Sequence, residues 1–236
     1  MNTHRFSRTE MLIGPEGLEK LKSSKVAVFG VGGVGSYTVE ALARAGIGEL
    51  ILVDFDDVDI TNINRQLHAL ESTVGKAKVE LMAERIKLIN PQARVQAIKR
   101  FYTPENGPEL ITPDLDYVVD AIDNVTGKLD LIKRCIANNI AIVASMGAGN
   151  KLDPTAFKVA DISQTSVCPL AKVVRRELRN AGINSGVKVV YSTEPAIKPP
   201  QNNGANERKQ PPGSISFVPA TVGLILASVV VKDLLV

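Results

Sequence analysis

The chain has 236 residues, of which 44% are hydrophobic and 22% charged, and its net charge is only +3. This composition predicts a well-packed core, and so small a charge neither requires nor excludes a nucleic-acid partner. The two cysteines, Cys135 and Cys168, form no C-x-x-C pair, which excludes a four-thiolate zinc site. Residues 1–14 are polar and contain no apolar signal segment, so we expect a cytoplasmic protein.

Short apolar runs alternate with helical patterns along the first 150 residues. Strands are expected at residues 25–30, 49–54, 94–99, 116–121 and 140–146. Helices are expected at residues 36–45, 75–90 and 128–138, and Pro91 stops the second of them. Strands and helices that alternate this regularly predict an α/β fold with a doubly wound, Rossmann-like and mostly parallel sheet.

The pattern changes after Gly149. An edge strand is expected at residues 156–163 and a basic helix from Pro169, whereas residues 198–214 are polar and proline-rich and predict a mobile loop. We therefore divide the chain into a Rossmann-like domain of residues 1–150 and a C-terminal extension of residues 151–236. The extension is expected to pack on the same domain and to carry antiparallel strands and helices.

One apolar stretch, residues 215–231, is almost long enough to suggest a membrane span. Pro219 interrupts it early, no basic cluster flanks it, and Lys232 and Asp233 follow at once. We interpret it as a buried or dimer-facing helix and expect no membrane span.

A glycine motif follows the first expected strand. Gly30, Gly32 and Gly35 have the spacing G-x-G-x-x-G, and Asp54 ends the next strand. The first glycine permits a tight turn, the second lets phosphate approach the backbone, and the third lets helix and strand pack closely. The motif predicts a nucleotide site in which Asp54 takes the ribose hydroxyls; the alternative is merely a tight strand-to-helix turn.

Polar and cationic residues after the second strand indicate which nucleotide is bound. A nicotinamide enzyme keeps its pyrophosphate intact, but Asn62, Arg65 and Lys78 can surround a polyphosphate that is cleaved. Lys78 falls in the first turn of its helix, where a cation opposes the macrodipole, so a ligand or a solvated surface position must explain it. These residues favour nucleotide cleavage over hydride transfer.

Two aspartates, Asp120 and Asp123, lie at the end of the strand expected at residues 116–121. They lie at the carboxyl edge of the expected sheet, where open α/β sheets bind ligands. A carboxylate there can hold Mg²⁺ against phosphates, and we assign that role to Asp123. Asp120 equally suits a turn-capping role.

Joined together, these motifs resemble the adenylate-forming superfamily of ubiquitin-activating enzymes and their bacterial ThiF/MoeB/HesA-type relatives. The stretches that carry the resemblance are "GVGGVGS", "DFDDVDITNINRQ", "VGKAK", "INP" and "DAIDN". It implies that ATP and Mg²⁺ activate a carboxylate. The implied nucleotide-binding residues are Gly30, Gly32, Gly33, Gly35, Asp54, Asp56, Asn62, Arg65, Lys78 and Asp123. The implied catalytic residues are Arg65, Lys78, Asp123 and Arg8, the last reaching the partner subunit's site in a homodimer.

The second half narrows the resemblance to the tRNA threonylcarbamoyladenosine dehydratase branch. It is carried by "MGAGNKLDPTAFKVADISQTSVCPLAKVVRRELR" and "VVYSTEPAIKP", and the missing C-x-x-C pairs set the chain apart from zinc-binding relatives. The resemblance implies a tRNA substrate, no zinc and a possible sulfur-mobilising protein partner. Tyr191, Ser192 and Glu194 belong to this segment but receive no chemical role.

The expected basic helix offers a direct hint of RNA. Its cations, Lys172, Arg175, Arg176 and Arg179, recur at spacings of three and four and form one stripe. Such a stripe can hold tRNA phosphates, or it can be a solvated face paired with Glu177.

The cysteines and histidines are weaker candidates. Cys168 precedes Pro169 at a helix N-terminus, where a thiol becomes more nucleophilic, but a substrate that cyclises on itself needs no enzyme thioester. Cys135 is expected in the core, and His4 and His68 have no partner that the sequence can place. Two other functions remain open: activation of a small ubiquitin-like or sulfur-carrier protein, and a nicotinamide-binding redox or sensor domain.

Overall fold

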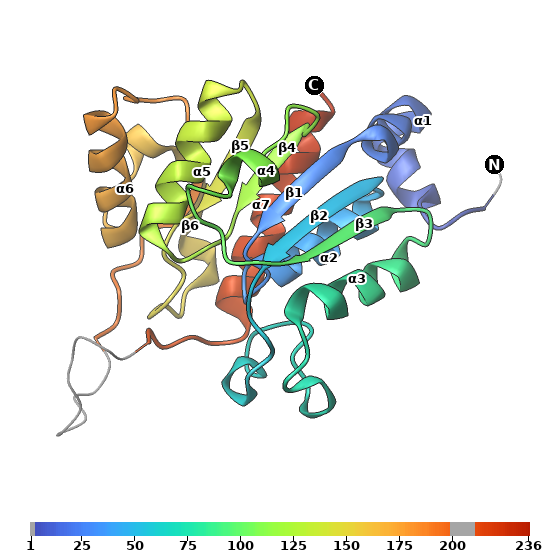
Figure 1. The fold of residues 1–236 in the computed structure, drawn as a ribbon, viewed down its shortest axis with the longest axis horizontal. Coiled ribbons are helices and arrows are strands. Elements are labelled where there is room, and N and C mark those ends of the chain that lie inside the picture. The colour runs from blue at the N-terminus through green and yellow to red at the C-terminus, as the bar shows by residue number, and fades with distance from the viewer. Residues whose placement is uncertain (1–2, 199–210) are drawn as a thin grey trace.

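In a computed structural model, residues 3–198 and 211–236 are described, so most of the loop expected at 198–214 lies outside the described residues. The α/β fold is confirmed: a seven-stranded sheet has the order β3-β2-β1-β4-β5-β7-β6 (Figure 1). The strands are β1 (Lys25–Phe29), β2 (Glu49–Asp54), β3 (Arg94–Lys99), β4 (Tyr117–Asp120), β5 (Ala141–Ser145), β6 (Phe157–Asp161) and β7 (Lys188–Ser192). All neighbouring strands are parallel except β6 and β7.

Helices cover both faces of the sheet. They are α1 (Ser7–Ser23), α2 (Gly35–Ala45), α3 (Lys78–Ile89), α4 (Gly107–Leu110), α5 (Val125–Ala137), α6 (Pro169–Asn180) and α7 (Phe217–Leu234). Apolar residues of α2, α3 and α7 form one core with the sheet, and those of α4, α5 and α6 form a second core on the other face. The continuous apolar runs of β1, β2 and β4 are explained by this double cover, because both faces of these strands are buried.

The apolar stretch that resembled a membrane span is the core helix α7. By length and composition alone it passes the test for a spanning helix, but half of its residues are buried inside the protein. It runs behind the sheet and packs along α2 (Figure 1). At Gly223 the two helices approach so closely that an added Cβ would lie 2.3 Å from the Val34 carbonyl oxygen.

The N-terminal helix α1 was not expected from the sequence. Gly14, with φ of 72°, and Pro15 break its regular geometry and obscure its pattern. Helix α1 leads directly into β1 and packs against α7, so it lies at the edge where the parallel strands begin (Figure 1). We call this the amino edge, and the opposite one the carboxyl edge.

Candidate nucleotide-binding site

The glycine turn connects β1 to α2 at the carboxyl edge, and two of its glycines are required by packing. Gly30 has a φ of 84°, and a Cβ on it would lie 2.7 Å from the Ala121 carbonyl oxygen. A Cβ on Gly35 would lie 1.8 Å from the Gly30 carbonyl oxygen. Neither position tolerates a side chain, so the turn has one tightly fixed shape.

The middle of the turn is open. At Gly32 an added Cβ would meet only the Gln66 amide nitrogen, 3.8 Å away, and Gly33 faces Arg65 and Pro219 at 3.4 and 3.3 Å. No side chain caps the N-terminus of the eleven-residue helix α2. Its first amides and the bare backbone at Gly32 therefore suit a phosphate group.

Asp54 fastens the glycine turn to the end of β2. Its carboxylate accepts hydrogen bonds from the Val31 amide at 2.6 Å and the Asp56 amide at 2.9 Å. Burial raises the pKa of the Asp54 carboxyl, although the two amides and the nearby charge of Lys78 act in the opposite direction. Each carboxylate oxygen keeps a second lone pair, so contact with ribose hydroxyls remains possible and stays a prediction.

Lys78 is held at the site by Asp56. It is the first residue of α3, its side chain is only 5% exposed, and its Nζ lies 2.7 Å from Asp56 Oδ2. The Lys78 amide also donates to the Asp56 carbonyl oxygen. The pairing explains how a cation is tolerated at a helix N-terminus, and it brings two predicted site residues together.

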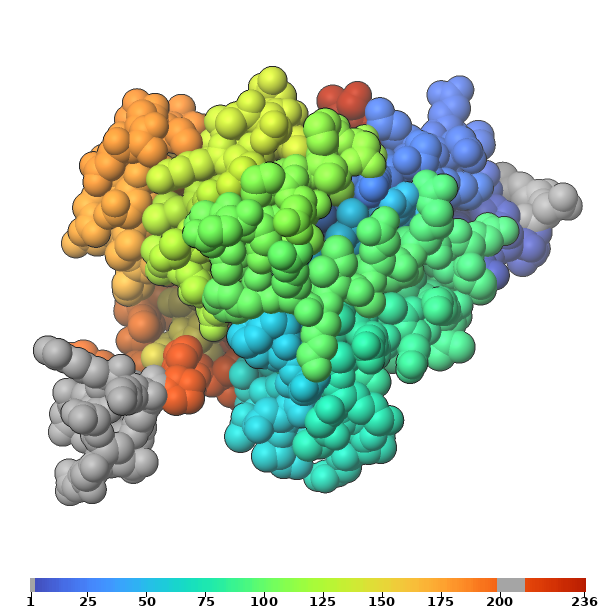
Figure 2. Space-filling view, in the orientation of Figure 1, coloured from blue at the N-terminus to red at the C-terminus, as the bar shows by residue number. Residues whose placement is uncertain are grey.

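Asn62 and Arg65 belong to a loop that folds back over the glycine turn, and Figure 2 shows this loop region projecting at the carboxyl edge. Asn62 is buried, and its Oδ1 caps a short 3-10 helix by accepting from the Asp59 amide at 3.1 Å. Arg65 donates to the Thr61 carbonyl oxygen and to Asn64 Oδ1, both at 2.9 Å. The Arg65 stem thus lies beside Gly33 while its guanidinium is bound within its own loop.

The two aspartates after β4 have different environments. Asp123 is exposed between β4 and α5, whose N-terminus is capped by the neighbouring Asn124. Asp120 is fully buried, pairs with Lys128 Nζ at 2.7 Å, and accepts from the Ile122 amide. Asp120 therefore caps the turn, as the alternative interpretation held.

An exposed carboxylate suits Mg²⁺, which is commonly held by one or two carboxylates together with substrate phosphates. Within residues 3–198 and 211–236, no three His, Cys, Asp or Glu side chains form a metal-binding group. Asp123 fits the ion only in company with phosphate oxygens.

Arg8 does not join this site within one chain. It is exposed in the first turn of α1, at the amino edge, while the glycine turn lies at the carboxyl edge (Figure 1). A contact between Arg8 and a nucleotide requires a second copy of the chain.

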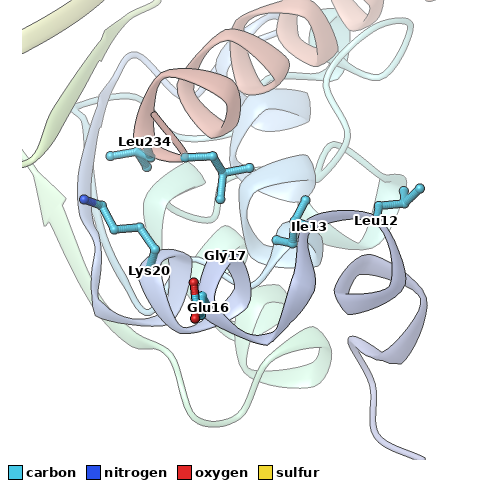
Figure 3. Close-up of a pocket in the computed structure, with 7 residues that line it drawn as sticks. Leu12, Ile13, Glu16, Gly17, Lys20 and Leu234 are labelled. Atoms are coloured by element: carbon cyan, nitrogen blue, oxygen red, sulfur yellow. The ribbon is translucent and has the colours of Figure 1, made fainter.

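A cavity of about 470 Å³ also lies at the amino edge, between α1 and the end of α7 (Figure 3). Its lining residues are Leu12, Ile13, Glu16, Gly17, Lys20, Leu234 and Leu235. It shares no residue with the predicted nucleotide site. The chemistry of the glycine turn, and not the size of this hollow, locates the candidate site.

The basic stripe on α6 is only partly free. Lys172, Arg176 and Arg179 are exposed, but Arg175 is half-buried and donates to the Thr165 carbonyl oxygen at 2.7 Å. Arg176 pairs with Glu177 at 2.7 Å. Of the four cations expected to lie mostly on one face, Arg175 is the one whose guanidinium binds a neighbouring turn.

The remaining candidates are mostly structural. Cys168 is 2% exposed, which disfavours a free nucleophile, and burial raises the pKa of Cys135 to about 12. Ser192 accepts from the Glu194 amide, and the Glu194 carboxylate accepts from the amides of residues 152 and 153. These hydrogen bonds hold the loop after β5 against the "YSTE" segment, residues 191–194.

Residues 211–219 border the predicted site, which the sequence did not reveal. The Ser214 carbonyl oxygen accepts from Asn64 Nδ2 at 3.0 Å, and Pro219 touches Gly33. Neither residue belongs to a nucleotide-binding motif. Only the return of the chain to the carboxyl edge brings them there.

Comparisons with known proteins agree with this geometry. The chain matches the ThiF family over residues 6–235. It is 54% identical to the tRNA threonylcarbamoyladenosine dehydratase of Bacillus subtilis (strain 168), covering 98% of this chain and 95% of that protein. The crystal structure of the Escherichia coli enzyme, TcdA, in complex with ATP has a TM-score of 0.90 at 41% identity, covering 98% and 93% of the two chains. Escherichia coli MccB in complex with ATP, at 20% identity and a TM-score of 0.69, shares the fold alone.

Proposed function

The chain belongs to the ThiF family, and from this premise we propose that it is an ATP-dependent tRNA threonylcarbamoyladenosine dehydratase. The observation that carries the proposal is the 54% identity to such an enzyme over almost the full length of both chains. A relative at 41% identity binds ATP on the same fold. The open Gly32 backbone and the nearby cation of Lys78 support a phosphate site in this chain.

The proposed reaction has two steps. A carboxylate oxygen of the threonyl group, beside the anticodon, attacks the α-phosphorus of ATP and pyrophosphate leaves. The carbamoyl group of the same modification then attacks the activated carbonyl carbon, loses a proton, and expels AMP as an oxazolone-type ring closes. Over the two steps the nucleoside loses the elements of one water molecule.

In this scheme Lys78 and Arg65 neutralise charge that builds on the phosphates as the bond to pyrophosphate breaks. Lys78 is prepared for this role because Asp56 fixes its ammonium in a nearly dry position. Arg65 must exchange its contacts with Thr61 and Asn64 for phosphate oxygens. Asp123 is the residue that would hold Mg²⁺, which supplies further neutralisation of phosphate charge when bound.

The proposed active unit is a homodimer in which the partner's site receives Arg8. The exposed position of Arg8 at the amino edge supports this arrangement. Helix α7 also leaves Phe217, Leu224 and Val231 at least partly exposed at seven-residue intervals, a stripe suited to a second copy. In a mixture of Arg8→Ala and Asp123→Ala proteins, some turnover should return, because mixed dimers then contain one intact site.

The proposed tRNA surface is the exposed part of the α6 stripe, Lys172 and Arg179, assisted by Arg176. Cations of this kind contact phosphates without reading sequence. A cytoplasmic location and a sulfur-mobilising partner stay predictions.

The test is to mix the protein with ATP, Mg²⁺ and tRNA that carries threonylcarbamoyladenosine. AMP should appear only with this tRNA, and the nucleoside mass should fall by one water. AMP production without dependence on tRNA would contradict the proposal.

Activation of a carrier protein is the alternative, and the comparisons do not favour it. It predicts pyrophosphate exchange with a carrier ending in Gly-Gly and loss of transfer in Cys168→Ala. The burial of Cys168 is an observation against such a thioester.

A further inference from the structure

Buried polar atoms without partners gather beside the glycine turn. Among residues 3–198 and 211–236, four buried side-chain nitrogen or oxygen atoms have no hydrogen-bond partner. They are Gln66 Oε1, both ring nitrogens of His68, and Asn90 Oδ1 on the residue that follows the end of α3. Leaving such groups unpaired is costly, so their concentration at one place requires a reason.

Gln66 points at the part of the turn that is otherwise bare. Its Nε2 is the nearest atom to the position a Cβ would take on Gly32, at 3.8 Å, and no other atom lies within 4 Å. The residue is only 7% exposed. Its carboxamide makes no hydrogen bond to any described residue, and its Oε1 is buried.

The backbone around Gln66 is firmly held, so this orientation follows from the loop. The Gln66 amide donates to the Asn62 carbonyl oxygen at 2.9 Å, and its own carbonyl oxygen accepts from the Ala69 amide at 3.1 Å. The next amide, that of Leu67, donates to Ser36 Oγ in the first turn of α2. The loop that carries Gln66 is thus bound to the helix whose N-terminus faces the phosphate site.

We propose that Gln66 is a phosphate-binding residue of this enzyme and donates its side-chain amide to a phosphate oxygen of ATP above Gly32. This inference rests on the proposed function, because it requires that ATP occupies the glycine turn. Lys78 and Arg65 supply charge from the sides, whereas Gln66 supplies a neutral donor over the bare backbone. A neutral donor fixes the position of a phosphate without opposing the departure of pyrophosphate.

His68 lies two residues further along the same loop, near the charge of Lys78. Both ring nitrogens are buried without partners, and burial, reinforced by the charge of Lys78, lowers the pKa of His68 to about 4. The ring is therefore neutral near pH 7 and adds no positive charge behind Gln66. The site confines its cations to Lys78 and the arginines.

The test compares Gln66→Met, which keeps the side-chain volume but removes the amide, with the matched control Gln164→Met at an exposed glutamine. Binding of ATP and of adenosine is measured by calorimetry and by competition, together with Tm. In Gln66→Met, ATP should bind about tenfold more weakly, the loss expected for a hydrogen bond to a charged group, while adenosine binding stays unchanged. The Tm should stay the same or rise, since a buried unpaired polar group has been replaced by an apolar one.

This combination separates a ligand contact from a structural role. Unchanged ATP affinity in Gln66→Met would overturn the inference, as would an equal loss for ATP and adenosine together with a lower Tm. If Gln66→Met fails to fold, Gln66→Leu, which also lacks the amide and adds no charge, replaces it, and selective weakening of ATP over adenosine is again required. Failure of the wild-type protein to bind ATP would instead refute the proposed function.

Discussion

The two edges of the sheet differ in how their polar groups are paired: ion pairs gather at the amino edge, whereas three of the four buried atoms without a described partner belong to a loop at the carboxyl edge. At the amino edge, Glu49 pairs with Lys25 at 3.1 Å and with Arg94 at 2.6 Å, and Lys25 also meets Asp114 at 2.6 Å. At the carboxyl edge, Gln66 Oε1 and both ring nitrogens of His68 are buried and have no partner among the described residues. A polar group whose hydrogen bonds are complete stabilises the fold, and one left incomplete in a buried position points to a ligand.

The largest expected effect is on activity at the carboxyl edge. In Lys78→Met, turnover should fall at least about a hundredfold, because charge developing on the phosphates loses its buried cation. The free energy of unfolding should change much less, since the released partner, Asp56, is partly exposed. Single-turnover AMP release and urea unfolding measure the two quantities, and retained activity would remove Lys78 from the mechanism.

Next comes a pair at the carboxyl edge, Lys128 and Asp120, in which both side chains are buried. In Lys128→Met, the free energy of unfolding should fall by about 3–5 kcal/mol, because Asp120 is left as an uncompensated buried carboxylate. Lys128 also donates to the Ser145 carbonyl oxygen at 2.9 Å, so the ends of β4 and β5 both lose an anchor. Urea unfolding checks the loss. The double variant Lys128→Met, Asp120→Leu should recover much of it, and no recovery would argue against the pairing as the cause.

The pH dependence of stability offers a third comparison. The pKa of His68 is about 4 in the folded chain and about 6.5 when unfolded, so the unfolded chain binds more protons between these values. The stabilising contribution is complete above pH 6.5 and is lost as the pH falls towards 4, by at most about 3 kcal/mol. In His68→Leu, this dependence of the free energy of unfolding on pH should be absent when urea unfolding is compared at pH 7.5 and pH 5. Identical slopes in both proteins would show that His68 is solvated.

The smallest effect belongs to the amino edge. In Arg94→Gln, stability should change by less than about 1 kcal/mol and turnover should not change, because the Arg94 side chain is 81% exposed and its ion pair is screened by water. The measurements are urea unfolding and AMP release. A large loss of activity would mean that the amino edge takes part in catalysis beyond Arg8.

Much of the fold and part of the candidate site could be predicted from local sequence patterns. The strand-to-helix alternation gave the sheet, and the spacing of Gly30, Gly32 and Gly35 located the turn, because both depend on residues close in sequence. The same holds for Lys78, which the pattern placed in the first turn of its helix. Helix α1 was not predicted because Gly14 and Pro15 interrupt its periodicity.

Contacts between residues that lie far apart in the sequence could not be predicted from such patterns. Asp120 and Asp123 look alike in sequence, yet the fold buries one beside Lys128 and exposes the other. In the sequence Arg175 does not differ from the neighbouring cations, and only the structure shows that it donates to the Thr165 carbonyl oxygen. Gln66 ends one of the stretches that carry the family resemblance, but the sequence assigned it no role.

The sequence by itself determined the α/β class, the nucleotide motif and the family, since these depend on residue order along short stretches. Only the tertiary structure decided which buried polar side chains have hydrogen-bond partners within the described part of the chain and which do not. Burial and hydrogen-bond partnership arise from segments far apart in the chain, such as the two that meet where Asn64 donates to Ser214.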